Sequence, residues 1–325
     1  MADKKTGLGH LLRCRVLLLE MARRGWAAEL IFLGPPSILK RWDWPESIKI
    51  TCEGESVSIG DVRKALAQKL ANNTVDWVII DGYDFRGTSW RTQVNIENAR
   101  LLMLDDIGDQ VFTADAVLNP NGTNQDYYLV RGINAELWML GSEYALIEPV
   151  YIAPKEKKLN EVLKRVLVVF GGADKRQMTP KSVDSLLEID PTLQLDVVLG
   201  PYSTWSDLPV EQTNLVFHYA PAGLAELMLQ ADLIVTAAGS TAWQACAAGC
   251  PSIVVQTVDN QAQIVATLLK SDAALLVGAE KLNSGLADAV KALRSVEARE
   301  AMVQKARRLV DGKGARRVVD AMVAW

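Results

Sequence analysis

Short apolar runs alternate with helix-forming stretches along the whole chain. Strongly apolar runs lie at residues 75–80, 165–170 and 233–235, with Asp76 and Arg165 as their only charged residues. A short uninterrupted apolar run is typical of a parallel strand that is covered on both faces. Helical spacing marks other stretches, such as residues 59–71 and 296–309. The alternation predicts an α/β protein in which helices cover both faces of parallel sheets.

The length of 325 residues predicts two domains, because single hydrophobic cores rarely grow this large. Both halves carry a glycine loop next to a helix, and a polar stretch separates them. We therefore predict an N-terminal domain over residues 1–153 and a linker over residues 154–164. The C-terminal domain is predicted over residues 165–325, and its last helices close the chain.

The first glycine loop has no strand in front of it. Residues 1–6 are Met-Ala-Asp-Lys-Lys-Thr, and Gly7-Leu8-Gly9-His10 then runs directly into a helix. A doubly wound domain places a strand ahead of such a loop. We expect that the first strand of the N-terminal domain is missing, or that the natural chain starts upstream.

Polar residues follow three of the predicted strands. Asp81 comes after the run at 75–80, Asp105 and Asp106 follow residues 100–104, and Asn119 to Gly122 follow residues 116–118. The carboxyl ends of parallel strands meet at one edge of a sheet, where open α/β sheets bind their ligands. Each residue alone could be a loop residue or a helix cap, but three such strand ends favour a ligand site.

A turn in the second half is suited to an anion. Ala238-Gly239-Ser240-Thr241 follows the apolar run at 233–235 and precedes a helix. The N–H groups of a first helical turn lack partners within the helix, so they attract a phosphate or a diphosphate. A capped helix without a ligand is an equally good interpretation of this turn alone. A second glycine loop, Gly171-Gly172-Ala173-Asp174, follows the strand at 165–170.

Composition excludes several classes of protein. Hydrophobic residues make up 49% of the chain and charged residues 23%, and the net charge is −4. This balance is ordinary for a soluble globular protein and argues against a dedicated nucleic-acid binder. The chain has no run of about 18 apolar residues and no apolar leader at its start, so we expect a cytoplasmic protein without membrane insertion.

Cysteine and histidine offer few sites for chemistry. Cys14, Cys52, Cys246 and Cys250 have no spacing typical of metal ligands, so we expect small buried hydrophobes and no bound metal. His10 and His218 are the two histidines. His10 stands in a helix-start loop where a ligand can approach, whereas His218 is expected to be structural.

The ordered motifs of the chain resemble a known family. Gly7-Leu8-Gly9-His10-Leu11-Leu12-Arg13-Cys14 looks like the G-x-G-H-x-x-R-C opening of the UDP-2,4-diacetamido-2,4,6-trideoxy-β-L-altropyranose hydrolases of pseudaminic acid biosynthesis. The resemblance covers nearly the whole chain. Further matches follow in the same order: Asp81 with Tyr83, Leu104-Asp105-Asp106, Leu118-Asn119, Gly141 with Tyr144-Ala145-Leu146, Phe170 to Asp174, Ala238 to Thr241, and Asp259-Asn260-Gln261.

The resemblance implies a GT-B-like fold, with two Rossmann-like domains whose parallel sheets face a central cleft. Lipid-linked N-acetylglucosaminyltransferases of peptidoglycan synthesis are similar more distantly. The implied reaction is inverting attack of water on the anomeric carbon of a UDP-sugar, which gives free sugar and UDP. It implies no cofactor and no metal, and we expect a monomer or a weak oligomer.

The resemblance also implies roles for individual residues. His10 would orient or deprotonate the water, and Asn260 would hold the sugar or the phosphate at the catalytic centre. The remaining expected site residues are Gly172, Gly239, Ser240, Thr241 and Gln244 for UDP, and Gly9, Arg13, Tyr83, Asp105, Asn119 and Gln261 for the rest of the substrate.

Two positions depart from the family pattern. Gly82 stands where the family usually has His, and Gln244 stands where it usually has a Glu that accepts hydrogen bonds from ribose. Gln keeps an acceptor oxygen but lacks the charge, so its hydrogen bonds are weaker. Two alternatives therefore stay open: a GT-B glycosyltransferase that uses a UDP-sugar donor, and a sugar-nucleotide binder without turnover.

Overall fold

The computed structural model describes residues 8–53, 58–82, 94, 96, 98–122, 124–152, 154, 158–205 and 213–325. Two compact units make up the chain. Unit 1 consists of Met1–Leu146 with Lys313–Trp325, and unit 2 consists of Ile147–Gly312. Both units are α/β, as the alternating pattern predicts, and all of their paired strands are parallel.

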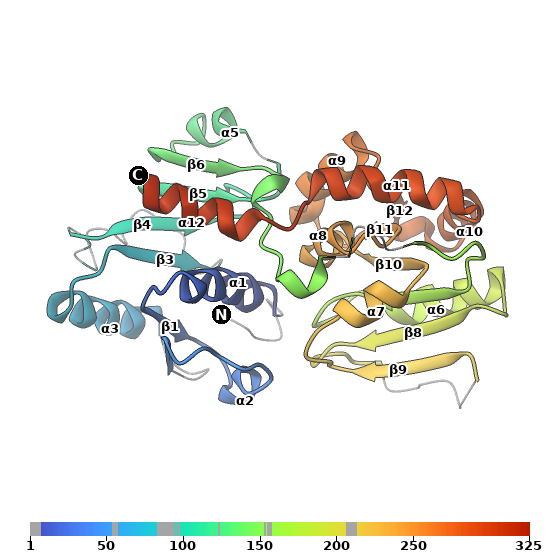
Figure 1. Ribbon diagram of the computed structural model, residues 1–325, viewed down its shortest axis with the longest axis horizontal. Helices are drawn as coiled ribbons and strands as arrows, with labels where there is room; N and C mark the ends of the chain where they lie inside the picture. Colours follow the sequence, from blue (N-terminus) through green and yellow to red (C-terminus); the bar gives the residue numbers. More distant parts are fainter. Residues whose placement is uncertain are drawn as a thin grey trace. The chain divides into compact units, whose positions relative to one another are not determined.

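Unit 1 contains two parallel sheets (Figure 1). One pairs β1 with β2, and the other has the strand order β3-β4-β5-β6. The strands are β1 (Ala28–Phe32), β2 (Ile48–Cys52), β3 (Trp77–Asp81), β4 (Arg100–Leu104), β5 (Ala116–Asn119) and β6 (Leu137–Leu140). The helices are α1 (Gly9–Arg23), α2 (Pro36–Leu39), α3 (Ile59–Asn72), α5 (Gln125–Leu129) and α12 (Gly314–Ala324).

Local sequence explains where the helices of unit 1 begin and end. The first turn of α3 is closed by a capping box, in which Ser58 and Asp61 bond each other's backbone N–H groups. Gly25 follows α1 with a φ of 78°, a left-handed conformation that ends helices and favours glycine. The chain then continues into β1. Gly25 therefore sets the carboxyl end of α1, whereas His10 lies at its amino end.

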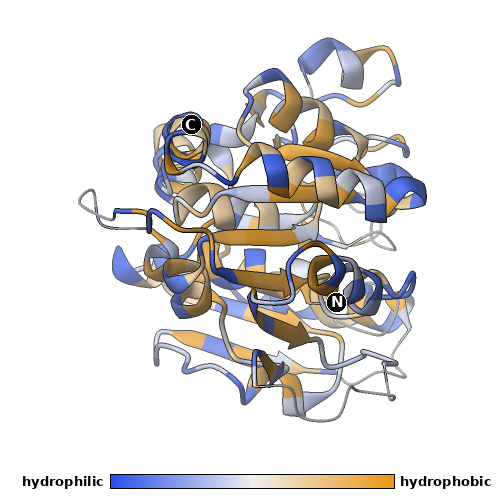
Figure 2. Ribbon diagram, turned by 90° about the vertical axis from the view of Figure 1, so that its right-hand side faces the viewer, coloured by the Kyte–Doolittle hydropathy of each residue, from blue (hydrophilic) through white to orange (hydrophobic). Residues whose placement is uncertain are grey.

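Unit 2 contains one six-stranded parallel sheet of order β12-β11-β10-β7-β8-β9. Apolar residues predominate in its central strands, which are largely orange in Figure 2. The strands are β7 (Arg165–Val169), β8 (Gln194–Leu199), β9 (Leu215–Tyr219), β10 (Leu233–Ala237), β11 (Ser252–Gln256) and β12 (Leu275–Gly278). The helices are α6 (Met178–Ile189), α7 (Ala225–Gln230), α8 (Ser240–Ala247), α9 (Ala262–Lys270), α10 (Leu282–Ala292) and α11 (Val296–Leu309).

The last helix differs from the predicted domain division. Residues 165–325 were expected to form one domain, but α12 belongs to unit 1. Its apolar side chains Val318, Val319 and Met322 are buried in a cluster with residues of α1 and of the β3–β6 sheet. The boundary between the units also lies earlier than predicted, between Leu146 and Ile147. Sequence pattern could mark α12 as a helix but could not say which sheet its apolar face covers.

Candidate functional site

The carboxyl ends of β3, β4 and β5 bring polar residues together in unit 1. The three strands are parallel neighbours, and Asp81 is paired with Leu104 at the end of its strand. Asp105 and Asp106 come directly after β4, and Asn119 ends β5. α1 begins at the same edge, because its His10 contacts Asp81. This gathering agrees with the expectation drawn from the three polar strand ends.

His10 is held by a buried carboxylate. Its Nδ1 lies 2.7 Å from Asp81 Oδ1, and the side chains of His10 and Asp81 are 5% and 2% exposed. The carboxylate is ionised, since its pKa is held well below its usual range, and an ionised carboxylate can only accept. Nδ1 also lies 2.9 Å from Arg13 Nη2, which can only donate, so the two contacts require opposite roles of this nitrogen. We assign the ring proton to Nδ1, because its contact with the ionised Asp81 is the shorter one. In the neutral ring the lone pair then belongs to Nε2, which is the nitrogen able to act as a base.

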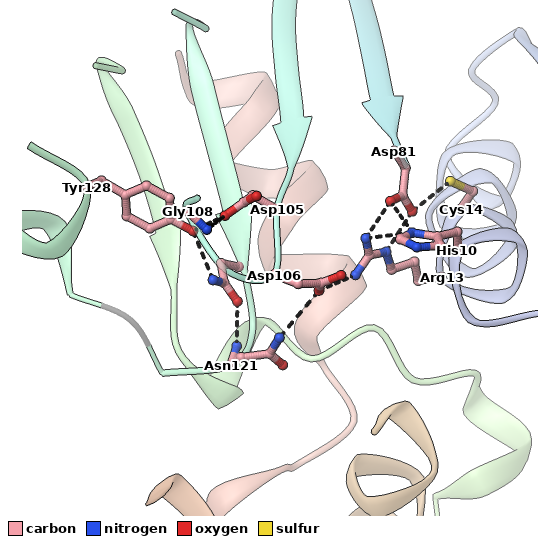
Figure 3. A network of polar contacts seen from close by, with 10 residues as sticks. His10, Arg13, Cys14, Asp81, Asp105, Asp106, Gly108, Asn121 and Tyr128 are labelled. Atoms are coloured by element: carbon pink, nitrogen blue, oxygen red, sulfur yellow. Dashed lines mark hydrogen bonds and ion pairs between the residues drawn. The ribbon is translucent and has the colours of Figure 1, made fainter. Parts of the chain in front are cut away.

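Arg13 clamps two carboxylates on the same edge (Figure 3). Its Nε donates to Asp81 Oδ2 at 2.6 Å, its Nη2 donates to Asp81 Oδ1, and its Nη1 donates to Asp106 Oδ1 at 2.5 Å. Burial alone would raise the pKa of Asp81 and of Asp106, but the charge and hydrogen bonds of Arg13 outweigh it and lower both. The same two carboxylates raise the pKa of Arg13 against its own burial. The pKa shifts of Arg13, Asp81 and Asp106 all favour the charged forms of these three groups.

Cys14 lies beside the same carboxylate but is not a candidate nucleophile. Its Sγ is 3.4 Å from Asp81 Oδ2. Burial raises the pKa of the thiol strongly, and the negative charge of Asp81 raises it further. A thiol that stays protonated is a poor nucleophile, so Cys14 contributes packing and a weak donor.

A second set of hydrogen bonds forms the framework behind this edge. Tyr128 donates to Asp105 Oδ2 at 2.9 Å and accepts from Asn119 Nδ2 at 2.8 Å. Asp105 Oδ2 also accepts from the backbone N–H of Gly108 at 2.6 Å, and Asn119 Oδ1 accepts from the backbone N–H of Asn121 at 2.8 Å. Asn121 Nδ2 reaches Asp106 Oδ1 at 3.3 Å and so links the framework to the Arg13 clamp.

The framework changes the roles expected for Asp105 and Asn119. They are 1% and 0% exposed, and the atoms named above bond within the protein. We therefore assign them to shaping the loops after β4 and β5 and not to contact with substrate. Arg13 likewise serves to hold two carboxylates. Gly9 is the first residue of α1, one position before His10. The expected site residue Tyr83 lies outside the described residues.

In unit 2, the turn between β10 and α8 has the expected geometry in part. Gly239 is the N-cap of α8 in an extended conformation, and no side chain caps the helix. The N–H of Gly239 is not available to a ligand, because it donates to Ala237 O at 2.9 Å. Among the described residues we find no acceptor for the N–H groups of Ser240 and Thr241. Those two groups, together with half-buried Gln244 on the same helix, form the candidate anion site.

The other glycine loop of unit 2 is already satisfied. Asp174 caps α6, because its carboxylate accepts from the backbone N–H groups of Met178 at 2.9 Å and Thr179 at 2.6 Å. A Cβ on Gly200 would lie 2.6 Å from the Cα of Gly172, so glycine is needed there for close backbone packing. This position of Gly172 favours a packing role over the expected contact with UDP.

Asn260 and Gln261 lie in the short 3-10 helix Asp259–Gln261, ahead of α9. Gln261 Oε1 accepts from the backbone N–H of Thr257 at 2.7 Å, so this oxygen stabilises the local turn. The side-chain oxygen of Gln261 therefore has a structural role. Asn260 is half-buried on the same turn after β11, at the carboxyl edge of the unit 2 sheet.

Three residues of unit 1 help to hold the site together, although they were not among the predicted site residues. Asp81 orients His10, Asp106 shares Arg13 with Asp81, and Asn121 joins the two hydrogen-bond networks. Their positions at or within two residues of the carboxyl ends of β3, β4 and β5 were the available signal. The pairing of each with a particular partner depends on side chains that are 15 to 93 positions apart in the chain.

The described part of the chain holds no cluster of His, Cys, Asp or Glu suited to a metal ion, and all four cysteines are free thiols. Within the same residues, no helix has the length and apolar character needed to cross a bilayer.

Comparison with known proteins gives two related sequences. The chain is 30% identical to the uncharacterized protein MJ1062 of Methanocaldococcus jannaschii over 48% of its length. It is 26% identical over 65% of its length to SpsG of Bacillus subtilis, a spore coat polysaccharide biosynthesis protein. The matches span 34% of MJ1062 and 65% of SpsG, which is less than two thirds of either relative. No family model matches the chain.

Solved structures with the same fold cover nearly the whole chain. A putative UDP-N-acetylglucosamine 2-epimerase from Listeria monocytogenes matches with a TM-score of 0.66 at 12% identity, over 99% of this chain and 94% of the other. CalG4, the calicheamicin glycosyltransferase, matches with a TM-score of 0.63 at 15% identity, over 98% and 96%. The chain has a GT-B-like fold of two Rossmann-like domains.

Proposed function

We propose that the protein hydrolyses a UDP-linked 2,4-diacetamido-2,4,6-trideoxy sugar in pseudaminic acid biosynthesis. Water attacks the anomeric carbon, the bond from that carbon to the UDP oxygen breaks, and its electron pair leaves with UDP. The configuration at the anomeric carbon inverts, because attack and departure occur on opposite faces.

The observation that carries the proposal is the imidazole of His10 held by Asp81 and Arg13. The 2.7 Å contact with Asp81, shorter than the 2.9 Å contact with Arg13 Nη2, supports a proton on Nδ1 and a lone pair on Nε2. In this mechanism Nε2 acts as the general base and accepts a proton from the attacking water. The ionised Asp81 stabilises the imidazolium that forms. Asp81 and Arg13 are positioning residues in this scheme, since they act through His10.

The leaving diphosphate needs stabilisation at the moment when its charge develops. We assign this role to the N–H groups of Ser240 and Thr241 at the start of α8, where the helix dipole also favours an anion. Gln244 supplies an acceptor oxygen for a ribose hydroxyl, and Asn260 holds the sugar or the phosphate. The reaction as proposed needs neither metal nor cofactor.

The relatives support a role with carbohydrates. SpsG is named for spore coat polysaccharide biosynthesis, and the structural neighbours include a glycosyltransferase and a UDP-sugar epimerase by name. The likeness to CalG4 favours one second candidate, transfer of the sugar to an acceptor alcohol in place of water. Both candidates share the same base and the same leaving group.

The deciding experiment follows UDP release and the sugar anomer by NMR from UDP-2,4-diacetamido-2,4,6-trideoxy-β-L-altrose, without any acceptor. We expect UDP and free sugar, with the inverted anomer appearing first. UDP binding without turnover would indicate a transferase that lacks its acceptor, or a binder that has lost its chemistry.

The matched test of the base replaces the two histidines in turn. His10→Ala is expected to lower kcat by about 100- to 10,000-fold, the usual contribution of a general base, while UDP still binds. His218 lies in unit 2, and the His218→Ala variant is expected to retain turnover. Turnover retained in His10→Ala would remove His10 from the mechanism.

A further inference from the structure

Unit 1 contains a large cavity that shares Asp81 with the proposed site and is otherwise not used by the proposed function. Its volume is about 1130 Å³, above the ~300–1,000 Å³ of a typical small-molecule pocket. Two unbroken runs line it, residues 26–33 around β1 and residues 73–81 around β3. A strand that lines a cavity with its face would contribute every second residue, because side chains alternate between faces. Unbroken runs mean that the two strands border the cavity with their edges.

Both edges have unused backbone hydrogen-bonding groups. In the described residues β1 pairs with β2 alone, and β3 pairs with β4 alone. The bond from Ala28 N to Ser47 O shows which edge of β1 faces β2, so the backbone groups of Glu29 and Ile31 point the other way. Likewise Asp76 O accepts from Arg100 N, and the groups of Trp77, Ile79 and Asp81 point away from β4.

The remaining walls of the cavity are mainly apolar helix faces. Leu11, Leu18 and Met21 of α1 line one part, and Val62 and Leu66 of α3 line another. Open backbone edges on two sides and apolar side chains elsewhere are the surroundings of a central parallel strand. A small polar ligand would leave most of this apolar surface without a partner, so the walls fit an extended apolar segment better.

Chain direction assigns the place of such a strand in the sheet (Figure 1). α1 begins at the carboxyl end of β3, where His10 contacts Asp81. After α1, Trp26 lies in one apolar cluster with Trp77 at the start of β3. β1 therefore starts at the amino end and runs parallel to β3. A strand that led into α1 and then, through a right-handed crossover, to β1 would lie between β1 and β3.

The resulting order of strands is the usual one for a doubly wound domain. Counted from the added strand, the sheet would read 3-2-1-4-5-6, with β1 and β2 as the second and third strands and β3 to β5 following. β6 would extend the sheet beyond β5. The single insertion would join the two separate sheets of unit 1 into one.

We propose that this cavity, the strand slot, takes a parallel strand of apolar residues whose carboxyl end leads into α1. The strand pairs with both β1 and β3 and is covered by α1 and α3. It is strand addition at two edges at once, in which backbone bonds give affinity and apolar walls select the residues. The strand slot does not depend on the proposed hydrolysis.

The first test adds a peptide to the full chain. The peptide has about six valine, isoleucine and leucine residues, a usual strand length, with lysines at both ends for solubility. Amide hydrogen exchange is expected to slow at Glu29, Ile31 and Ile79. The matched control carries proline in the middle of the peptide, which removes a donor and prevents pairing, and it is expected to give no protection.

The second test joins the same apolar segment, or its proline version, to Met1 of the chain. A tether raises the local concentration of the segment to about millimolar. The apolar extension is expected to raise Tm by more than about 5 °C over the proline extension, with slower exchange at β1 and β3.

Edge strand β9 of unit 2 reports unspecific pairing, because it too has a single neighbour. Protection at β1 and β3 in either format, with β9 unchanged, supports the strand slot. Equal Tm and equal exchange for the two extensions, without protection by the added peptide, would overturn it. Protection of β9 to the same degree would overturn it as well.

Discussion

The two units each contain a histidine, an aspartate and an arginine joined in one cluster. In unit 1 these are His10, Asp81 and Arg13, and in unit 2 they are His218, Asp196 and Arg165. In both clusters one carboxylate accepts from the imidazole and from the guanidinium. The residue types are therefore the same, and the differences lie in geometry and position.

The ring nitrogen that contacts the carboxylate differs. His10 uses Nδ1 at 2.7 Å, whereas His218 uses Nε2 at 2.8 Å. Exposure differs too: the side chains of His10 and Arg13 are 5% and 15% exposed, but those of His218 and Arg165 are 25% and 36% exposed. Arg13 also bridges to a second carboxylate, and this bridge fixes the unit 1 cluster more firmly.

Position in the sheet differs most. Asp81 is the last residue of β3, at the edge where parallel sheets bind ligands, whereas Asp196 is the third residue of β8 and lies inside its strand. β9, which carries His218, is an edge strand. The comparison teaches that the place of a His–Asp pair on the sheet, and not its composition, makes it a candidate for chemistry.

The largest expected effect comes from replacing the aspartate of each cluster by asparagine, which exchanges one carboxylate oxygen for an amide nitrogen. Asp81→Asn is expected to lower kcat by about 100- to 10,000-fold with little change in KM. An amide can donate to Nδ1 and so move the ring proton to Nε2, the nitrogen that must accept a proton. The measurement is steady-state UDP release, with its pH profile. Asp196→Asn is the control and is expected to keep kcat within about twofold; equal losses in both variants would remove the distinction between the clusters.

A second effect concerns stability. Arg13→Gln leaves Asp81 and Asp106 buried without their shared cation, and removal of one partner of a buried ion pair costs about 3–5 kcal/mol. Arg165→Gln breaks a pair whose arginine is 36% exposed, and the buried Asp196 keeps His218 as a partner, so we expect a smaller loss. Urea unfolding of both variants at neutral pH measures the difference. Similar losses would mean that burial does not separate the two clusters.

The smallest effect is on the acid side of the stability profile. The folded-state pKa of Asp81 is lowered, so the stability that it contributes is present above the unfolded pKa of about 3.9 and is lost as pH falls further. The slope is about 1.4 kcal/mol per pH unit for each proton taken up. Asp81→Asn should therefore flatten the profile below about pH 4 more than Asp196→Asn does.

The comparison is made by urea midpoints between neutral pH and acid. Asp196 also has a lowered pKa, since Arg165 and His218 outweigh its burial, so its variant is expected to flatten the same region to a lesser degree. A steeper acid loss in Asp81→Asn than in the unchanged protein would contradict the assignment of Asp81 as an ionised, stabilised group.

Much of the architecture could be predicted from the sequence because local rules decide it. The stretch at residues 100–104 became β4 with the expected bounds, and the helical spacing at residues 296–309 gave α11. The polar residues after β3, β4 and β5 share one edge, since parallel strands in one sheet all end on the same side. β6 was not predicted, because a run of four apolar residues is too short for its pattern to distinguish a strand from a helix.

Tertiary structure alone decided which polar groups meet. Asp105 and Asn119 match motif positions, yet packing buried them behind Tyr128. Asp81 gained its role because α1 places His10 and Arg13 beside the end of β3. Likewise the sequence marked the end of the chain as a helix, but burial against α1 and the β3–β6 sheet assigned α12 to unit 1. Local pattern determines an element and the face that it must bury, whereas its partner depends on contacts between distant parts of the chain, which no local rule encodes.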